Sequence, residues 1–454
     1  MAIKRVITPF IFILTIGLAQ SAVATNGYFT HGLGVKNKAM AGAGTAMPEE
    51  AISAASNPAA AVMVGSRFEV GASFFSPRRS YESSASLVNG NFGAFTIGPN
   101  DIDSDREYFV IPYIGKVWDY KDNAALAVNF YGRGGMSSYW SGGTATFDPD
   151  GPGPAPVMTL PGTYGDGTVR MNLSQAFLDT TAAFDLGSWK VGITVVLAIQ
   201  AFKTEGLNNF AGFTETFAAS GGMTFPTNLT NNGTEFSYGY GLKLGAIWEA
   251  NERLNLGIAY QSETIMTDLD EYADLFAESG GFDIPASFRL AVSFLATPAV
   301  SLHFDYERTW YSEIDSIGNS ITNLFACPTT GQGGTSLSSC LGGNNGAGFF
   351  WDDIDVFKFG IQWVSSDKMT YRAGYSTTDQ PIDSSEVLFN ILAPGVVEEH
   401  FTFGFTRVLS NDREFSMSFM YAPSNSVKGR NTFDPTQTLK IEMYQYEIEF
   451  GYRF

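Results

Sequence analysis

The chain has 454 residues, 44% of them hydrophobic and 14% aromatic, and it carries 46 acidic against 27 basic residues. This acidic balance argues against a nucleic-acid partner, because phosphate backbones require a basic surface. After the first 24 residues the sequence holds no run of about 18 uncharged apolar residues, so no transmembrane helix is predicted.

The first 24 residues have the pattern of a secretory leader. Lys4 and Arg5 precede an apolar stretch at 6–18, and a small-residue triplet ends at Ala24. We therefore expect residues 1–24 to be a signal peptide. No Pro/Ser-rich linker or charge run divides the remainder, which predicts one large domain with a single N-terminal appendage.

Residues 25–64 do not alternate between apolar and polar side chains. The segment is rich in small residues and glycine, contains "NPAA" from Asn57, and allows a short helix around 49–55. A weakly apolar segment of this length cannot bury a core alone, so it must pack against the rest of the protein. We predict that it is a hatch, meaning a plug inside the lumen of a barrel.

From residue 65 to 454 the sequence contains many stretches in which apolar and polar residues alternate. In 238–246 and 444–454, every second side chain is apolar or aromatic. Successive strand side chains point to opposite faces, so each stretch has an apolar face and a wet face, as in a membrane barrel. Strands are predicted near 67–77, 107–118, 123–135, 169–186, 188–205, 235–249, 253–268, 285–297, 299–313, 353–365, 369–380, 397–410, 413–422 and 440–454.

The connections between these fourteen strands alternate in length. Short ones such as "TPA" and "NDR" are each followed by a longer Gly/Asn/Asp/Ser-rich segment, the last of them at 423–439. Short periplasmic turns and long outer loops give this pattern in outer-membrane barrels. The predicted fold class is all-β: a fourteen-stranded antiparallel transmembrane β-barrel at 65–454, with the hatch at 25–64 inside its lumen.

Three glycines interrupt the third predicted strand, namely Gly132, Gly134 and Gly135. Glycine within a strand often marks a bulge or a close backbone approach, which would kink the strand here. Fraying of the strand near a loop would give the same pattern.

Apolar residues crowd the third and fourth predicted outer loops. They are Phe210, Phe213, Phe217 and Phe225 in the third loop, and Leu275 and Phe276 in the fourth. Exposed aromatic residues in loops need a partner. Either they form a groove that binds an apolar ligand, or they only pack the two loops together.

Alternation also places both apolar and charged residues on the inward faces of strands. The inward candidates are Phe177, Phe202, Lys243, Arg289, Lys358, Arg372 and His400. The aromatic rings would favour an apolar substrate, which gains about 0.8 kcal/mol per buried methylene. An inward cation would either hold a substrate carboxylate or join a salt-bridge network that braces the wall.

The only two cysteines, Cys327 and Cys340, lie in the fifth predicted outer loop. An exported protein folds in an oxidising compartment, so we expect them to form a disulfide, worth about 3 kcal/mol in the chain-entropy model. The rival interpretation, half of a zinc site, lacks a nearby histidine or third cysteine. We predict no metal site and no cofactor.

Several segments resemble the FadL/TodX family of outer-membrane transporters of long-chain fatty acids and hydrophobic compounds. The opening "NGYF", the run "AMAGAGTA" and the motif Asn57, Pro58 and Ala59 are similar to the hatch of that family, and "YRAGYSTTDQPI", "EEHFTFGF" and a terminal Phe are similar to its later strands. The resemblance implies capture of a hydrophobic molecule in a groove between the third and fourth outer loops, and lateral exit through a gap in the barrel wall. It also places the kinked strand beside the Asn-Pro-Ala motif.

Two other functions fit parts of the sequence. A general polar porin would share the barrel but has no use for a plug. A barrel enzyme would need a nucleophile setting such as GxSxG, which accompanies none of the three histidines. We therefore expect a transporter that is not an enzyme.

The expected location is the bacterial outer membrane. The expected partners are a hydrophobic small molecule, either a fatty acid or a hydrocarbon, and outer-membrane lipid including lipopolysaccharide. Acidic outer loops would meet the lipopolysaccharide phosphates through divalent cations. We expect a monomer that binds no nucleic acid.

Overall fold

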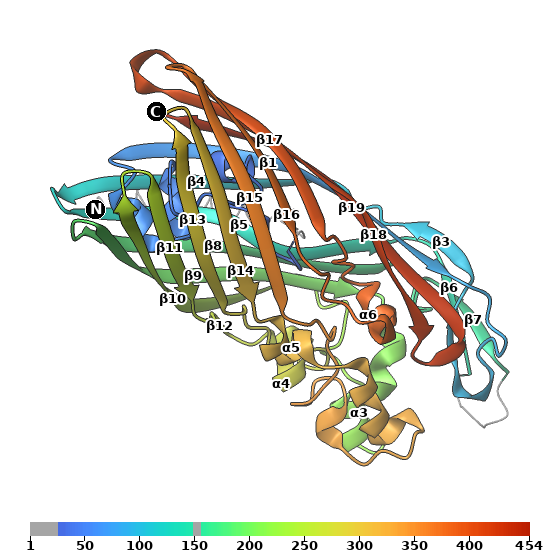
Figure 1. Ribbon diagram of the computed structural model, residues 1–454. Coiled ribbons are helices and arrows are strands. Elements are labelled where there is room, and N and C mark those ends of the chain that lie inside the picture. The colour runs from blue at the N-terminus through green and yellow to red at the C-terminus, as the bar shows by residue number, and fades with distance from the viewer. Residues whose placement is uncertain (1–25, 149–155) are drawn as a thin grey trace, which may run out of the picture.

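Fourteen antiparallel strands form one closed barrel in the computed structural model, which describes residues 26–148 and 156–454 (Figure 1). The predicted signal peptide at 1–24 lies outside the described residues. The strands are β1 (Arg67–Ser83), β4 (Phe109–Lys121), β5 (Ala124–Trp140), β8 (Val169–Asp185), β9 (Trp189–Glu205), β10 (Glu235–Asn251), β11 (Leu254–Gln261), β13 (Ser287–Thr297), β14 (Val300–Thr309), β15 (Ile354–Ser366), β16 (Met369–Thr377), β17 (Glu399–Val408), β18 (Glu414–Asn431) and β19 (Asp434–Arg453).

The barrel closes where the last strand meets the first. β19 pairs with β1 from Arg453 opposite Glu69 to Leu439 opposite Ser83, and with β18 on its other side. The aromatic end of the chain is therefore an interior strand of the sheet rather than an exposed edge. The predicted fold class is confirmed.

One predicted loop is wrong. Residues 423–439 were expected to form the seventh outer loop, but β18 continues to Asn431 and β19 begins at Asp434, which leaves only a turn at 432–433. These strand ends were missed because the sequence there is polar on both faces, without the alternation used to find the other strands.

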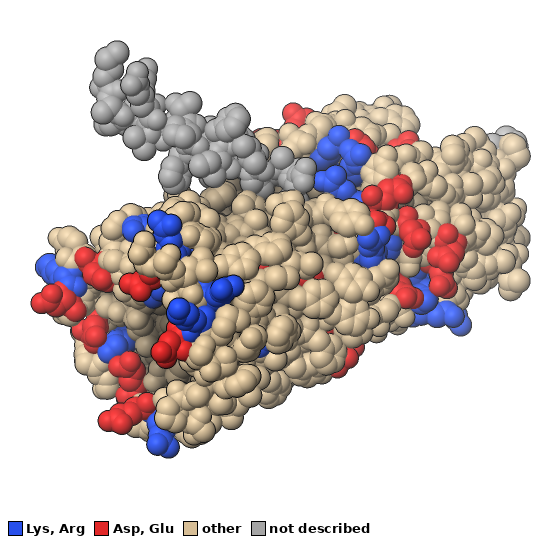
Figure 2. Space-filling view, turned by 90° about the horizontal axis from the view of Figure 1, so that it is seen from above, with Lys and Arg blue, Asp and Glu red and all other residues tan. Residues whose placement is uncertain are grey.

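The outward side chains of the strands form an apolar belt. Phe74 is 54% exposed, Ile193 45% and Leu197 50%, although all three lie in regular strands. Figure 2 shows a band with few charged residues between two zones where Lys, Arg, Asp and Glu gather. Exposed apolar side chains in such a band face lipid. Among the described residues, no helix has the length and apolar character needed to cross a membrane.

Residues 26–64 lie inside the barrel and are mostly buried (Figure 1). They contain the short helix α2 (Val35–Lys38) and two 3-10 turns, η1 (Ala51–Ala55) and η2 (Pro58–Val62). The hydrogen bonds that fix them are made largely to the barrel, for example from Gly44 N to Asp305 Oδ1 at 2.8 Å. We call residues 26–64 the hatch segment below; the domain boundaries at 24/25 and 64/65 stay predictions.

The outer connections carry short helices that gather at the end of the barrel opposite the C-terminus (Figure 1). These are α3 (Glu215–Ala219), α4 (Ala277–Gly280), α5 (Asp315–Gly318) and α6 (Val387–Asn390). Further 3-10 turns of the outer connections are η3 (Asn91–Gly93), η4 (Asn208–Phe213), η5 (Asp270–Tyr272), η6 (Tyr311–Glu313), η7 (Ile321–Ala326), η8 (Pro328–Thr330), η9 (Leu337–Ser339) and η10 (Ser384–Glu386), whereas η11 (Ser410–Asp412) forms the short turn between β17 and β18. The predicted disulfide between Cys327 and Cys340 is confirmed, with a sulfur–sulfur distance of 2.04 Å.

Five short strands extend this outer end. β2 (Phe95–Ile97), β6 (Thr144–Phe147) and β7 (Met158–Pro161) form a small separate sheet, and β3 (Asn100–Asp103) pairs with the outer part of β1. β12 (Ile265–Met266) pairs with β10 beyond the point where β11 ends.

Candidate functional site

An apolar cavity of about 40 Å³ lies beneath the outer loops. It is lined from the wall by Met171 and Phe202, from the third and fourth loops by Leu207, Phe210, Leu275 and Phe276, and from the fifth and sixth loops by Leu341, Phe349, Phe389 and Leu392. Space of this size holds only a few water molecules, so an organic ligand would enter only if side chains moved. Most of the lining residues belong to loops, which move more readily than strands, so such movement is feasible.

The structure brings only part of the predicted groove together. Phe210, Leu275 and Phe276 line the cavity. Phe213 instead stacks on Phe433, with 5.4 Å between ring centroids. Phe217 and Phe225 contact each other at 5.3 Å, and Phe225 is 69% exposed.

Sequence reasoning missed the contribution of the fifth and sixth outer loops. Phe389 and Leu392 come from the sixth loop, which folds into the mouth of the barrel: the indole N–H of Trp140 donates to Ile391 O at 3.1 Å, and the Ser138 hydroxyl donates to Leu392 O at 2.7 Å. The apolar run "VLFNILAP" at 387–394 is a signal that could have found them, because so apolar a run is not expected in a solvated loop.

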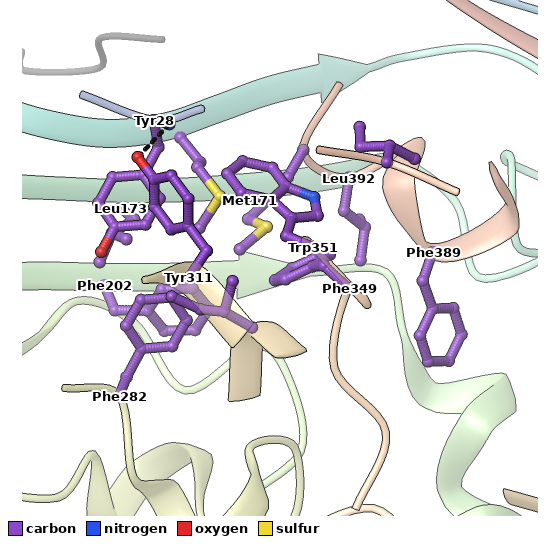
Figure 3. Close-up of a cluster of buried hydrophobic side chains, with 14 of the residues drawn as sticks. Tyr28, Met171, Leu173, Phe202, Phe282, Tyr311, Phe349, Trp351, Phe389 and Leu392 are labelled. Atoms are coloured by element: carbon purple, nitrogen blue, oxygen red, sulfur yellow. Dashed lines mark hydrogen bonds between the residues drawn. The ribbon is translucent and has the colours of Figure 1, made fainter. Parts of the chain in front are cut away.

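Aromatic side chains connect the cavity to the hatch segment (Figure 3). Phe349 contacts Trp351 at 6.3 Å between centroids, Trp351 contacts Tyr311 at 5.4 Å, and Tyr311 contacts Tyr28 at 5.2 Å. The Tyr311 hydroxyl also donates to Asn26 O at 2.7 Å. A layer of aromatic surface therefore runs from the cavity to the start of the hatch segment.

The three glycines of β5 lie at an interruption in the wall. The register between β5 and β8 shifts between Gly132 and Gly134, and the pairing of β5 with β4 ends at Tyr131 opposite Tyr113. A Cβ atom at Gly134 would collide with Gln175 Oε1 and would meet the Phe29 ring at 3.1 Å. Gly134 is therefore a position where only glycine allows the close approach.

The hatch segment takes the place of β4 along this part of β5. Thr30 N donates to Arg133 O at 3.0 Å, and Gly135 N donates to Tyr28 O at 3.0 Å. The Arg133 guanidinium lies over the Phe29 ring, 4.3 Å from its centroid. The wall is thus completed here by hydrogen bonds to the hatch segment and not by a neighbouring strand.

The Asn-Pro-Ala motif contacts a different part of the wall. The Asn57 side chain accepts a hydrogen bond from Ala59 N at 3.0 Å, which caps the 3-10 turn opened by Pro58. Its amide group donates to Ala246 O in β10 and Ile258 O in β11. The kink in β5 therefore lies beside Tyr28–Thr30 and not, as the resemblance implied, beside this motif.

The predicted inward cations form ion pairs in the lumen. Lys243 Nζ lies 2.7 Å from Asp179 Oδ2, and Arg372 Nη2 lies 2.5 Å from Glu49 Oε2. Arg289 and Lys358 share the carboxylate of Glu307 at 2.7 and 2.6 Å. The other inward candidates pack against aromatic rings: Phe177 stacks on Tyr131, and His400 stacks on His31.

All four of these ion-paired cations also contact the hatch segment directly, Arg289 by donating to the Thr45 hydroxyl at 3.3 Å. Lys243 donates to Ala55 O at 2.9 Å, Lys358 donates to His31 O at 3.0 Å, and Arg372 pairs with Glu49. Burial alone would raise the pKa of Glu49, but the charges of Arg372 and Lys36 outweigh it and hold the pKa at about 2. The arrangement corresponds to the bracing network that we considered for these residues.

Glu50 organises the hatch segment from within. Its carboxylate oxygen accepts hydrogen bonds from Lys36 N at 3.0 Å and Asn37 N at 3.2 Å. Burial, followed by the charge of Glu69, raises the pKa of Glu50 to about 8. Nowhere in 26–148 or 156–454 do three His, Cys, Asp or Glu side chains gather in a way that could hold a metal ion.

The lipid-facing belt and the filled lumen define an outer-membrane transport barrel. The chain belongs to the family of outer membrane protein transport proteins (OMPP1/FadL/TodX), whose model matches residues 168–450. It is accordingly a protein of the bacterial outer membrane. No curated protein matches the sequence.

Solved structures share the fold over nearly the whole chain. The toluene transporter TodX of Pseudomonas putida is 15% identical, with 93% of this chain and 98% of that chain covered and a TM-score of 0.60. A FadL homologue of Pseudomonas aeruginosa is 15% identical, with 94% and 98% covered and a TM-score of 0.61. The toluene transporter TbuX of Ralstonia pickettii is 15% identical, with 93% and 98% covered and a TM-score of 0.58.

Proposed function

We propose that the protein takes up hydrophobic molecules from outside the cell through the apolar cavity beneath its outer loops. The molecule then passes the start of the hatch segment and leaves sideways between β4 and β5. The observation that carries this proposal is the aromatic layer that joins the cavity to the interrupted wall, from Phe349 through Tyr311 to Tyr28. The names of TodX and TbuX, both toluene transporters, support the same class of substrate.

The ion pairs of the lumen support an apolar rather than an ionic route. Lys243, Arg289, Lys358 and Arg372 already have carboxylate partners, and each partner would lose its cation if a substrate carboxylate took its place. The cavity lining is apolar apart from Thr204 and Ser316. A neutral hydrocarbon would enter it with less desolvation than a carboxylate.

The lateral exit is tested by filling the space between β5 and the hatch segment. Gly134→Val would place a side chain against the Phe29 ring, whereas Gly142→Val, just beyond the end of the same strand, meets only the Ile102 methyl at 3.5 Å. We expect Gly134→Val to reduce uptake of a radiolabelled hydrocarbon by intact cells at least tenfold and Gly142→Val to leave it unchanged. Equal uptake by both variants, at equal amounts of folded barrel, would refute a lateral exit at this place.

A further inference from the structure

A polar pocket of about 300 Å³ opens beside the interrupted part of the wall. It lies between the segment that precedes β4, with Asp105 and Arg106, and three neighbouring strands that contribute Tyr139, Arg170 and Lys203. Asp105 N donates to Tyr139 O at 2.9 Å, which joins the two sides of the pocket.

Strand parity places the pocket on the outside of the barrel. In β8 the side chains of Met171 and Leu173 are buried in the core. Arg170 directly precedes Met171 in the same strand, so its side chain points the opposite way, to the outside of the barrel. In β9, Lys203 has the same parity as Ile193 and Leu197, which face lipid. Lys203 follows these residues toward the outer loops, so the pocket lies at the outer boundary of the apolar belt, at the level of lipid headgroups.

The pocket carries more positive than negative charge. Arg170 and Lys203 share one carboxylate, that of Glu205, at 3.6 and 2.6 Å. Arg106 has no carboxylate partner among the described residues and packs over the Phe109 ring at 5.2 Å. Burial, and then the charge of Arg170, lowers the pKa of Arg106, as expected for two cations that repel each other.

A fourth cation, Arg79, lies on the inner side of the wall, because it has the same parity in β1 as the buried Phe75 and Tyr81. Arg79 is only 4% exposed, donates to the backbone oxygen of Arg106 at 3.5 Å, and has one terminal nitrogen without a hydrogen-bond partner among the described residues. The lining cations Arg106, Arg170 and Lys203 outnumber the carboxylates of Asp105 and Glu205. Such an excess is unexpected in a chain with a net charge of −19, and an anion in the pocket would relieve it.

We propose that this pocket binds a phosphate group of lipopolysaccharide, with Arg106 and Arg170 as its principal donors. The planar guanidinium group matches the oxygens of a phosphate. Strand parity places Arg170 at the level where the phosphates of lipid A lie, and Arg106 lines the same pocket. The bound lipid would then stand next to the interrupted wall between β4 and β5. The inference requires only the outer-membrane location and is independent of the substrate and of its exit.

The test compares lipid A that carries both phosphates with the same lipid A after enzymatic dephosphorylation, using protein delipidated in detergent. We expect Arg106→Gln/Arg170→Gln to weaken binding of the phosphorylated form at least tenfold and binding of the dephosphorylated form by less than twofold. The matched control is Lys440→Gln, which removes an outer cation already paired with Glu82 and Glu442. The control should bind like the wild type.

Three results would overturn the inference. Equal binding of phosphorylated lipid A by the double variant and the control would show that the pocket is not the site. Loss of binding in EDTA would show that divalent cations on acidic loops hold the lipid instead. Displacement of lipid A by palmitate or inorganic phosphate at similar concentrations would show a general anion site rather than a lipopolysaccharide site.

Discussion

Lys243 Nζ and Asp179 Oδ2 lie 2.7 Å apart in the lumen, where the side chains are 3% and 0% exposed. The same ammonium group donates to Ala55 O in the hatch segment at 2.9 Å and to the Tyr131 hydroxyl at 2.8 Å. One ion pair therefore joins β8, β10 and the hatch segment at a single point. Because both charges are buried, removal of one leaves the other without compensation.

We expect Lys243→Met to destabilise the folded barrel by about 3 kcal/mol, because the carboxylate of Asp179 would remain buried without its cation. The double variant Asp179→Asn/Lys243→Met should recover part of this loss. The measurement is the midpoint of heat-induced unfolding, followed by the change in electrophoretic mobility of the barrel. Equal midpoints for the single variant and the wild type would contradict the structural role of the pair.

The stability of the hatch segment should depend on pH through Glu50. Its pKa is raised to about 8 in the folded protein, above the usual value of 4.5, so the folded state favours the protonated form. The contribution of Glu50 to the stability of the folded state is then fully present below about pH 4.5 and is lost as the pH rises through about 8. We expect faster amide exchange of residues 26–64 at pH 9 than at pH 6.

The matched variant for this pH effect is Glu50→Gln. Glutamine preserves an oxygen that accepts from Lys36 N and Asn37 N but does not ionise. Exchange in the variant, corrected for its intrinsic pH dependence, should be the same at both pH values. If the wild type showed no difference in exchange between the two pH values, or if the variant retained that difference, the pH effect would belong to another group.

The periodicity of the sequence predicted the barrel well because lipid imposes it on every strand. Alternation predicted that Lys243 lies inside the lumen. It did not predict the contact of Lys243 with Ala55, because packing sets the position of a segment that has no periodicity. The glycines of β5 indicated the interruption at Gly134, but not that Tyr28 and Thr30 would pair there. The place of Phe389 in the cavity lining was not predicted, because a loop that folds into the barrel mouth has no repeating pattern.

The apolar character of the cavity is tested by a polar side chain of similar shape. Leu392→Asn would place an amide in the cavity lining, where its desolvation opposes the binding of a hydrocarbon by about 1–3 kcal/mol. We expect about tenfold weaker binding of toluene by the purified protein. Leu337→Asn is the control, because Leu337 is 38% exposed and lies outside the cavity. Equal binding by both variants would place the ligand elsewhere.

Conductance across planar bilayers separates a plugged transporter from a general polar porin. The hatch segment fills the lumen and is held by Lys243, Lys358 and Arg372, so the intact protein should show no large, steady openings. Deletion of residues 25–60 should produce them, because a fourteen-stranded barrel without filling leaves an aqueous channel. Proper folding of the deletion variant is checked by its electrophoretic mobility before and after heating. Large steady openings in the intact protein would instead identify a porin, since ions would then pass the hatch segment without its removal.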